Sequence, residues 1–500
     1  MLSALLLVLL PALAGAADDP LVRAAAAGDT AAIRALLKQG HDVNATGPDG
    51  ATALHWAVRA DDLATVDALI RAGAKVSVAN ALGVQPVYVA AQNGNAALLR
   101  RLLDAKADVN AADAAGDTLL MAAVRAESIE AVRLLLERGA NVNATDPDVR
   151  QTALMWATRV NSTEIMRALM TAGANVDTAT RASAKPAARP PGAGGGSHGV
   201  GIVRSGVPPQ GEQAPANGGM TPLLFAARDG LLDAAKLLVE AGANLNTADP
   251  NGITPLLMAI TNGQLPVARW LVERGADVKG ADWYGRTPIW AAVEVRNLDL
   301  RSSASNPADN GVDREAALGL IAALIDKGAD VNARVKEFPP ARRYMLPLGS
   351  LEWVDITGQT AFTRAAQSAD IEAMRLLLAK GADPKITTFN GTNALMMAAG
   401  VNWVISQTYG SRWLEATELC LDLGFDVNAV NQMGLAAVHG AANRGSDDVI
   451  ELLAKRGARL DVKDKEGRTP TTWAEGVFLA TNSPIAKPST IALISRLTKQ

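Results

Sequence analysis

The sequence is poor in the residues that build disulfides and metal sites. Its 500 residues include one cysteine, Cys420, and four histidines, namely His41, His55, His198 and His439. A single cysteine excludes an internal disulfide, and scattered histidines are too few for an ordinary zinc site. Cys420 lies between Leu419 and Leu421 in a helical pattern, so we predict a buried thiol. We therefore predict no metal.

Catalytic and nucleic-acid-binding patterns are missing as well. The chain contains no G-x-S-x-G, P-loop, H-E-x-x-H or kinase signature. A G-x-G-x-x-G string at 194–199 lacks the strand and helix that a phosphate-binding loop requires. The formal net charge is -3, without the basic stripe that phosphate contacts need. We predict that the protein is not an enzyme, binds no cofactor and has no nucleic-acid partner.

Long apolar runs are absent except at the N-terminus. There, Leu5 to Leu10 is apolar, and the small residues Ala14, Gly15 and Ala16 follow. This resembles a secretory signal peptide over residues 1–17, with a mature chain that begins near Ala17, although no Lys or Arg precedes the apolar run. A buried first helix is the alternative interpretation. We expect a periplasmic or secreted protein with no membrane span after cleavage.

Aromatic residues make up only 4% of the chain. The most regular feature of the sequence is a repeated unit. A Gly-Ala pair, or a close variant, recurs most often at intervals of 33 residues, as from Gly40 to Gly73. Small residues at helix ends are typical of stacked helix pairs. The first residues of the pairs are Gly40, Gly73, Lys106, Gly139, Gly173, Gly242, Gly275, Gly328, Gly381, Gly424 and Gly457.

The clearest copy runs from 434 to 467. Apolar residues at helical spacing predict a first helix that Gly445 ends and a second helix that Gly457 ends. The apolar side of the second helix is expected to comprise Val449, Ile450, Leu452 and Leu453. We expect Leu452 to fill the space between the helices and the next repeat.

The first helices open with T-P-L-H-like strings, such as TALHWA at 52–57, TPLL at 221–224 and 254–257, and TPIW at 287–290. With the 33-residue period, the chain resembles the ankyrin-repeat family. The resemblance implies an all-α solenoid of about 11–12 helix-turn-helix repeats, with β-hairpin-like finger loops. It also implies that His55 and His439 hydrogen-bond neighbouring turns. Four insertions break the period.

The predicted organisation is a single solenoid over 18–500 after the signal peptide. Its parts are an N-terminal cap repeat (18–50), repeats (51–177), a Pro/Gly-rich disordered insertion (178–219), repeats (220–296), an insertion between helices (297–314), a finger insertion (334–356), repeats (357–467), including one that is lengthened around 401–415, and a C-terminal cap (468–500).

The resemblance implies a protein partner that contacts finger tips and the exposed side of the first helices, in a chain that we expect to be monomeric. Aromatic and arginine side chains in one finger and the next insertion match the composition of an interface centre. The candidate partner-binding residues are Trp283, Tyr284, Arg286, Phe338, Arg342, Arg343 and Tyr344. In the alternative interpretation, Trp283 and Tyr284 only pack the 334–356 insertion against the repeats.

The sequence thus predicts an exported, non-catalytic interaction scaffold. One alternative is an accessory or protective factor for a periplasmic enzyme. The other is a secreted effector that acts on host proteins.

Overall fold

A computed structural model describes residues 19–183, 217–297, 311–336, 356–402, 412–477 and 485–499. Within these ranges the regular elements are helices, and no helix is long and apolar enough to cross a membrane. The predicted signal peptide and most of each predicted insertion lie outside the described residues.

The helices are short, and they come in pairs. Their bounds are α1 (Pro20–Ala26), α2 (Thr30–Lys38), α3 (Ala53–Arg59), α4 (Leu63–Arg71), α5 (Pro86–Gln92), α6 (Ala96–Asp104), α7 (Leu119–Arg125), α8 (Ile129–Glu137), α9 (Ala153–Arg159), α10 (Thr163–Thr171), α11 (Pro222–Asp229), α12 (Leu232–Glu240), α13 (Pro255–Thr261), α14 (Leu265–Glu273), α15 (Pro288–Asn297), α16 (Arg314–Asp326), α17 (Ala361–Gln367), α18 (Ile371–Ala379), α19 (Ala394–Ala399), α20 (Trp413–Asp422), α21 (Ala437–Arg444), α22 (Asp447–Lys455), α23 (Pro470–Gly476) and α24 (Pro488–Leu497).

The residue predicted to end each second helix has a left-handed backbone. All eleven of these positions have positive φ, from 74° at Lys106 and Gly424 to 96° at Gly242. Glycine adopts this conformation without steric cost, and Lys106 shows that one repeat tolerates a side chain there. The predicted repeat register and the all-α fold are therefore confirmed.

The first helices begin as the T-P-L-H strings predict. Thr221 and Thr254 cap α11 and α13, each followed by proline at the first helical position. His55 Nδ1 accepts from the backbone N–H of Thr52 at 3.0 Å, and its Nε2 lies 3.0 Å from the carbonyl oxygen of Val84 in the next finger. The structural role predicted for His55 is confirmed.

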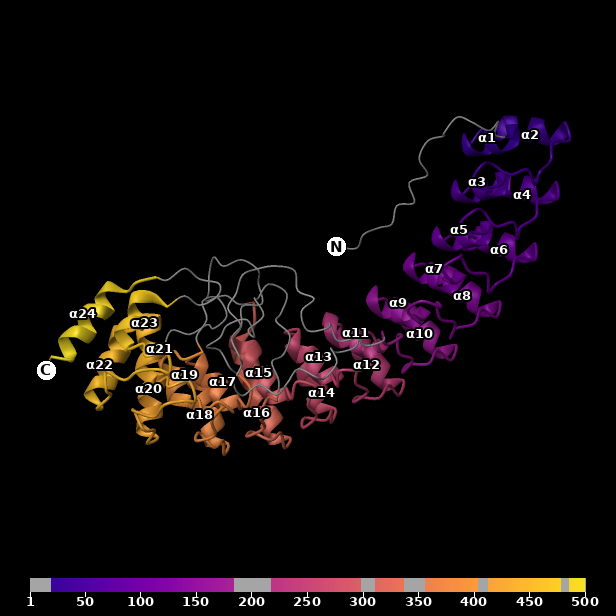
Figure 1. The fold of residues 1–500 in the computed structure, drawn as a ribbon. Helices are drawn as coiled ribbons and strands as arrows, with labels where there is room; N and C mark the ends of the chain where they lie inside the picture. Colours follow the sequence, from indigo (N-terminus) through magenta and orange to yellow (C-terminus); the bar gives the residue numbers. More distant parts are fainter. Residues whose placement is uncertain are drawn as a thin grey trace. The chain divides into compact units, whose positions relative to one another are not determined.

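Contacts divide the chain into two compact units. The first comprises Met1–Arg181 with Lys236–Gly242, and the second comprises Ala182–Ala235 with Ala243–Gln500. In the first unit, α1, α3, α5, α7 and α9 pack in sequence as one row, and α2, α4, α6, α8 and α10 pack behind them (Figure 1). In the second unit, the row of first helices runs α11, α13, α15, α17, α19, α21 and α23.

The predicted fingers are turns held by backbone hydrogen bonds. Only two isolated antiparallel bridges occur in the described residues, Thr46 with Thr52 and Ala112 with Thr118. Neighbouring fingers are also joined: the N–H of Ala81 donates to the carbonyl of Asp49 at 2.8 Å, for example. Several fingers are therefore each held by a hydrogen bond to the finger before them.

Buried side chains lie where the two helices of a pair meet. In α22, Val449, Ile450 and Leu453 are fully buried, whereas Leu452 is only partly buried. The prediction for Leu452 is wrong, because three-residue and four-residue spacing from Val449 and Ile450 selects Leu453. Cys420 is buried as predicted, and burial raises the pKa of its thiol to about 12.

Candidate protein-binding face

The structure describes three of the predicted binding residues, all in the finger between α14 and α15. The rings of Trp283 and Tyr284 are 4.9 Å apart in an edge-to-face arrangement. Trp283 is partly exposed, but Tyr284 is only 9% exposed. The backbone of this finger joins its neighbours, because Trp283 N donates to Asn251 O and Tyr284 O accepts from Lys336 N.

Arg286 is held inside the same finger. It is 5% exposed, and its Nε donates to Asp282 Oδ2 at 2.7 Å. Its guanidinium also lies 5.4 Å from the centre of the Tyr284 ring. Tyr284 and Arg286 therefore stabilise the finger, and their role in partner binding stays a prediction. Phe338, Arg342, Arg343 and Tyr344 lie outside the described residues, so their grouping with Trp283 stays a prediction.

A second set of aromatic and arginine residues lies on the first helices of the first unit. With the N-cap counted as the first residue, the fifth and eighth residues are Trp56 and Arg59 in α3, and Trp156 and Arg159 in α9. Residues three apart share one face of a helix. Both tryptophans are partly exposed, and both arginines are exposed. We name the residues at these two positions in α3, α5, α7 and α9 the first-helix face of the first unit.

Stacking and hydrogen bonds order this face. Two guanidinium groups stack on the Trp156 ring, with Arg125 at 5.0 Å and Arg159 at 4.6 Å from its centre. Arg125 pairs with Asp117, which also accepts a hydrogen bond from the Tyr88 hydroxyl. Burial and that hydrogen bond raise the pKa of Tyr88, so its hydroxyl stays protonated. The contacts link α5, α7 and α9.

Trp56, Trp156 and Arg159 are not among the binding residues predicted from the sequence. The sequence did contain a signal for them. With the N-cap threonine counted as the first residue, they occupy the variable fifth and eighth positions, where the repeat pattern does not demand tryptophan or arginine. Arg59 and Arg125 were covered by the expectation that the exposed side of the first helices contacts a partner.

The same positions are buried in much of the second unit. In α15, α17, α19 and α21 the fifth and eighth residues are all buried, including Glu294, Arg364 and Gln367. The Arg364 Nη1 donates to the Ser368 hydroxyl at 2.6 Å, and burial lowers the pKa of Arg364. Between α19 and α21 the backbones nearly touch, since a Cβ on Gly440 would lie 2.3 Å from Val401 N. This part of the row offers less accessible side-chain surface than the first unit.

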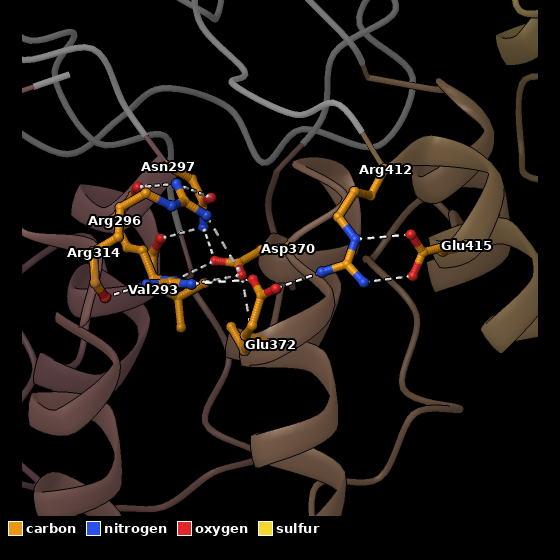
Figure 2. A network of polar contacts seen from close by, with 9 residues as sticks. Val293, Arg296, Asn297, Arg314, Asp370, Glu372, Arg412 and Glu415 are labelled. Carbon is orange, nitrogen blue, oxygen red and sulfur yellow. Dashed lines mark hydrogen bonds and ion pairs between the residues drawn. The ribbon is translucent and has the colours of Figure 1, made fainter. Parts of the chain in front are cut away.

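An ion-pair network with a buried centre joins the end of α15 to the N-termini of α18 and α20 (Figure 2). Arg296, 1% exposed, donates from Nε to Asp370 Oδ2 at 2.8 Å and from Nη2 to Glu372 Oε2 at 3.2 Å. Asn297 Nδ2 also donates to Asp370, at 2.8 Å. Arg412 then joins Glu372 to Glu415. The network thus ties α15, α18 and α20 together.

Asp370 is the centre of the network, and it also caps α18. Burial alone would raise its pKa, but the charge and hydrogen bond of Arg296, with contributions from Asn297 and Arg314, outweigh burial and lower it. The carboxylate is therefore ionised at neutral pH and has several donors. Removing the Asp370 carboxylate alone would lower stability strongly, because its buried partner Arg296 would lose its nearest counter-charge.

The described residues contain no group of three or more His, Cys, Asp or Glu side chains that could hold a metal ion. His55 and His439 are buried, and desolvation lowers the pKa of both imidazoles. Both are therefore neutral at pH 7 and part of the packed repeats.

Comparisons with known proteins agree on one family. The family model described as ankyrin repeats (3 copies) matches residues 4–80, 61–146, 87–180, 202–282 and 223–301. Cyclin-dependent kinase 4 inhibitor B of Bos taurus is 33% identical over 120 residues, which are 24% of this chain and 82% of that protein. The human counterpart is 37% identical over 112 residues, 22% of this chain and 73% of that protein.

Two further relatives match over smaller shares of their own length. An ankyrin repeat-containing protein of Schizosaccharomyces pombe is 32% identical over 60 residues, 12% of this chain and 29% of that protein. Human ankyrin repeat and KH domain-containing protein 1 is 33% identical over 119 residues, 23% of this chain but 4% of that protein. Among solved structures, the ankyrin repeat domain of Bcl-3 is 26% identical, covers 49% of this chain and 95% of that chain, and has a TM-score of 0.38.

Proposed function

Because the chain belongs to the ankyrin-repeat family, we propose that it is a non-catalytic scaffold that binds a protein partner through its fingers and first helices. Ankyrin repeats indicate protein–protein interaction, and in this family the fingers and first helices line the concave side where partners bind.

One observation carries this proposal: the first unit leaves the fifth and eighth residues of its first helices largely accessible. Trp56 and Trp156 are partly exposed, and Arg59, Gln92 and Arg159 are exposed. Tryptophan and arginine contribute most often to binding free energy at protein interfaces.

We also propose that the protein is exported, since residues 1–17 resemble a signal peptide. N-terminal sequencing of the protein from an extracytoplasmic fraction should give a start near Ala17. A chain that retains Met1 in that fraction would contradict the proposal.

The binding proposal can be tested with a photo-reactive amino acid in the full chain, expressed in the source cell. One variant carries it at Gln92 on the first-helix face, and a matched control carries it at Arg100, an exposed residue of α6 in the second-helix row. Irradiation should cross-link a specific protein at position 92 and not at position 100. Equal yields at both positions, or a product only at position 100, would exclude the first-helix face.

A further inference from the structure

We propose that the first-helix face of the first unit binds an extended peptide segment that carries carboxylate side chains. This inference rests on the proposed function and adds the chemistry of the partner. The residues that carry it are Trp56, Arg59, Arg125, Trp156 and Arg159.

The charged residues at the fifth and eighth positions of these four helices are all arginines. The eighth position is Arg59 in α3, Arg125 in α7 and Arg159 in α9, and in α5 it is the neutral Gln92. The fifth position in these four helices carries no charge. Asp117 is engaged by Arg125, whereas Arg59 makes no ion pair with another described residue. The face therefore complements an acidic segment.

The arginines are also arranged to bind with little loss of freedom. Arg59 lies 5.6 Å from the Trp56 ring centre, and Arg159 lies 4.6 Å from that of Trp156. A guanidinium that is already stacked loses less conformational entropy when it binds. Its planar N–H groups can then donate two parallel hydrogen bonds to one carboxylate. The exposed parts of the indole rings would cover the apolar stems of the bound segment.

The length of the face indicates an extended ligand. Three steps between neighbouring first helices separate α3 from α9. Packed helices are about 8–10 Å apart, so Trp56 and Trp156 are separated by roughly 24–30 Å. An extended chain rises about 3.3 Å per residue, so a segment of roughly eight residues reaches from Arg59 to Arg159.

A single-stranded nucleic acid is the competing ligand, because it also combines negative charge with flat rings. Two exposed acidic residues at the ends of the first helices, Asp61 and Glu127, argue against it. Asp61 follows Arg59 by two residues and Glu127 follows Arg125 by two residues, so both acidic side chains lie in the same row and would repel a continuous line of phosphates. The carboxylate groups of a peptide are spaced along its chain and need not lie next to Asp61 or Glu127.

The test begins with selection of random twelve-residue peptides on the immobilised full-length chain. A selected peptide, labelled with a fluorophore, is then titrated in an anisotropy assay. We expect enrichment of Asp and Glu, and affinity that falls as salt rises. Arg59→Gln combined with Arg159→Gln should weaken binding by roughly tenfold or more, because two charge-assisted contacts are lost. Replacing the peptide's Asp and Glu by Asn and Gln should have the same effect.

The matched control is Arg100→Gln combined with Arg167→Gln, which removes the same charge from exposed positions of α6 and α10. It should change affinity by less than about twofold, because these arginines belong to second helices and not to the first-helix face, and exposed charges are screened by salt. Circular dichroism melts of all variants check that they fold.

Two results would overturn the inference and leave the proposed function intact. One is selection of neutral or basic peptides whose binding ignores Arg59 and Arg159 but is lost with Trp56→Ala and Trp156→Ala. The other is tighter binding of a labelled single-stranded oligonucleotide than of any peptide. If no peptide is enriched and position 92 also captures no protein, both the inference and the proposed function fail.

Discussion

The first helices of the two units use charged residues in opposite ways. In the first unit, Arg59 and Arg159 are exposed beside partly exposed tryptophans. In the second unit, Arg296 and Arg364 are buried among partners within the fold. The repeat register is the same in both, so the difference lies in side-chain surroundings. An exposed arginine is available for recognition, whereas a buried one is committed to stability.

The contribution of a charged side chain to folding stability differs between the two settings. Exposed ion pairs contribute about 0–1 kcal/mol to stability, so the exposed arginines add little to folding of the first unit. Removing one member of a buried pair costs about 3–5 kcal/mol, because the other charge stays buried without compensation. Substitutions at matched positions can test this difference directly.

The largest effect is expected at Asp370. Asp370→Asn keeps an N-cap acceptor for α18 but removes the charge that Arg296 and Arg314 require, so it should destabilise the second unit by about 3–5 kcal/mol. The matched control is Asp62→Asn, which changes the equivalent N-cap of α4, where Asp62 is only partly buried. It should cost less than about 1 kcal/mol. Urea unfolding followed by hydrogen exchange in each unit measures both.

The pH dependence sharpens the same comparison. Asp370 has a lowered pKa, so its contribution is present above the pKa of an unfolded aspartate, about 3.9, and is lost as pH falls through the lower folded value. The stability gap between wild type and Asp370→Asn should therefore close below pH 4. Equal costs for Asp370→Asn and Asp62→Asn, or a gap independent of pH, would show that the network does not act through charge.

The second prediction concerns what the two units share. Leu453 in α22 and Leu135 in α8 stand at equivalent positions, and both are fully buried. Either one changed to alanine should cost about 2–5 kcal/mol, because each leaves a cavity in a packed helix pair. Leu452→Ala should cost less than about 1 kcal/mol, since Leu452 is only partly buried. A cost for Leu452→Ala as large as that for Leu453→Ala would place the core on the other side of α22.

The smallest effect is expected in the finger at 282–286. Tyr284 is buried, so Tyr284→Ala should lower stability by about 1–3 kcal/mol, and Trp283→Ala should cost less. Thermal melts and partner capture are measured on the single variants and the double variant. If the double variant instead keeps its melting temperature and loses at least about tenfold in affinity, 1.4 kcal/mol, these rings are a binding site like the first-helix face.

Much of the fold could be predicted because its determinants are local. A left-handed glycine, an N-cap threonine and a proline at the first helical position each act within a few residues. Repetition multiplies these signals, so even Lys106, which departs from the pattern, could be assigned correctly. Leu452 could not, because both Leu452 and Leu453 are apolar, and only the packed helix pair distinguishes them.

The sequence by itself therefore determined the repeat, its register and its family, since these depend on contacts between neighbours along the chain. Only the tertiary structure decided which charges are accessible. Arg59 and Arg296 both stand near the C-terminal end of a first helix, and no local pattern separates them. What separates them is Asp370, which follows Arg296 by 74 residues and reaches it only when α15 and α17 pack side by side. Burial and pairing depend on that packing, and they decide whether an arginine stabilises the fold or is exposed for binding.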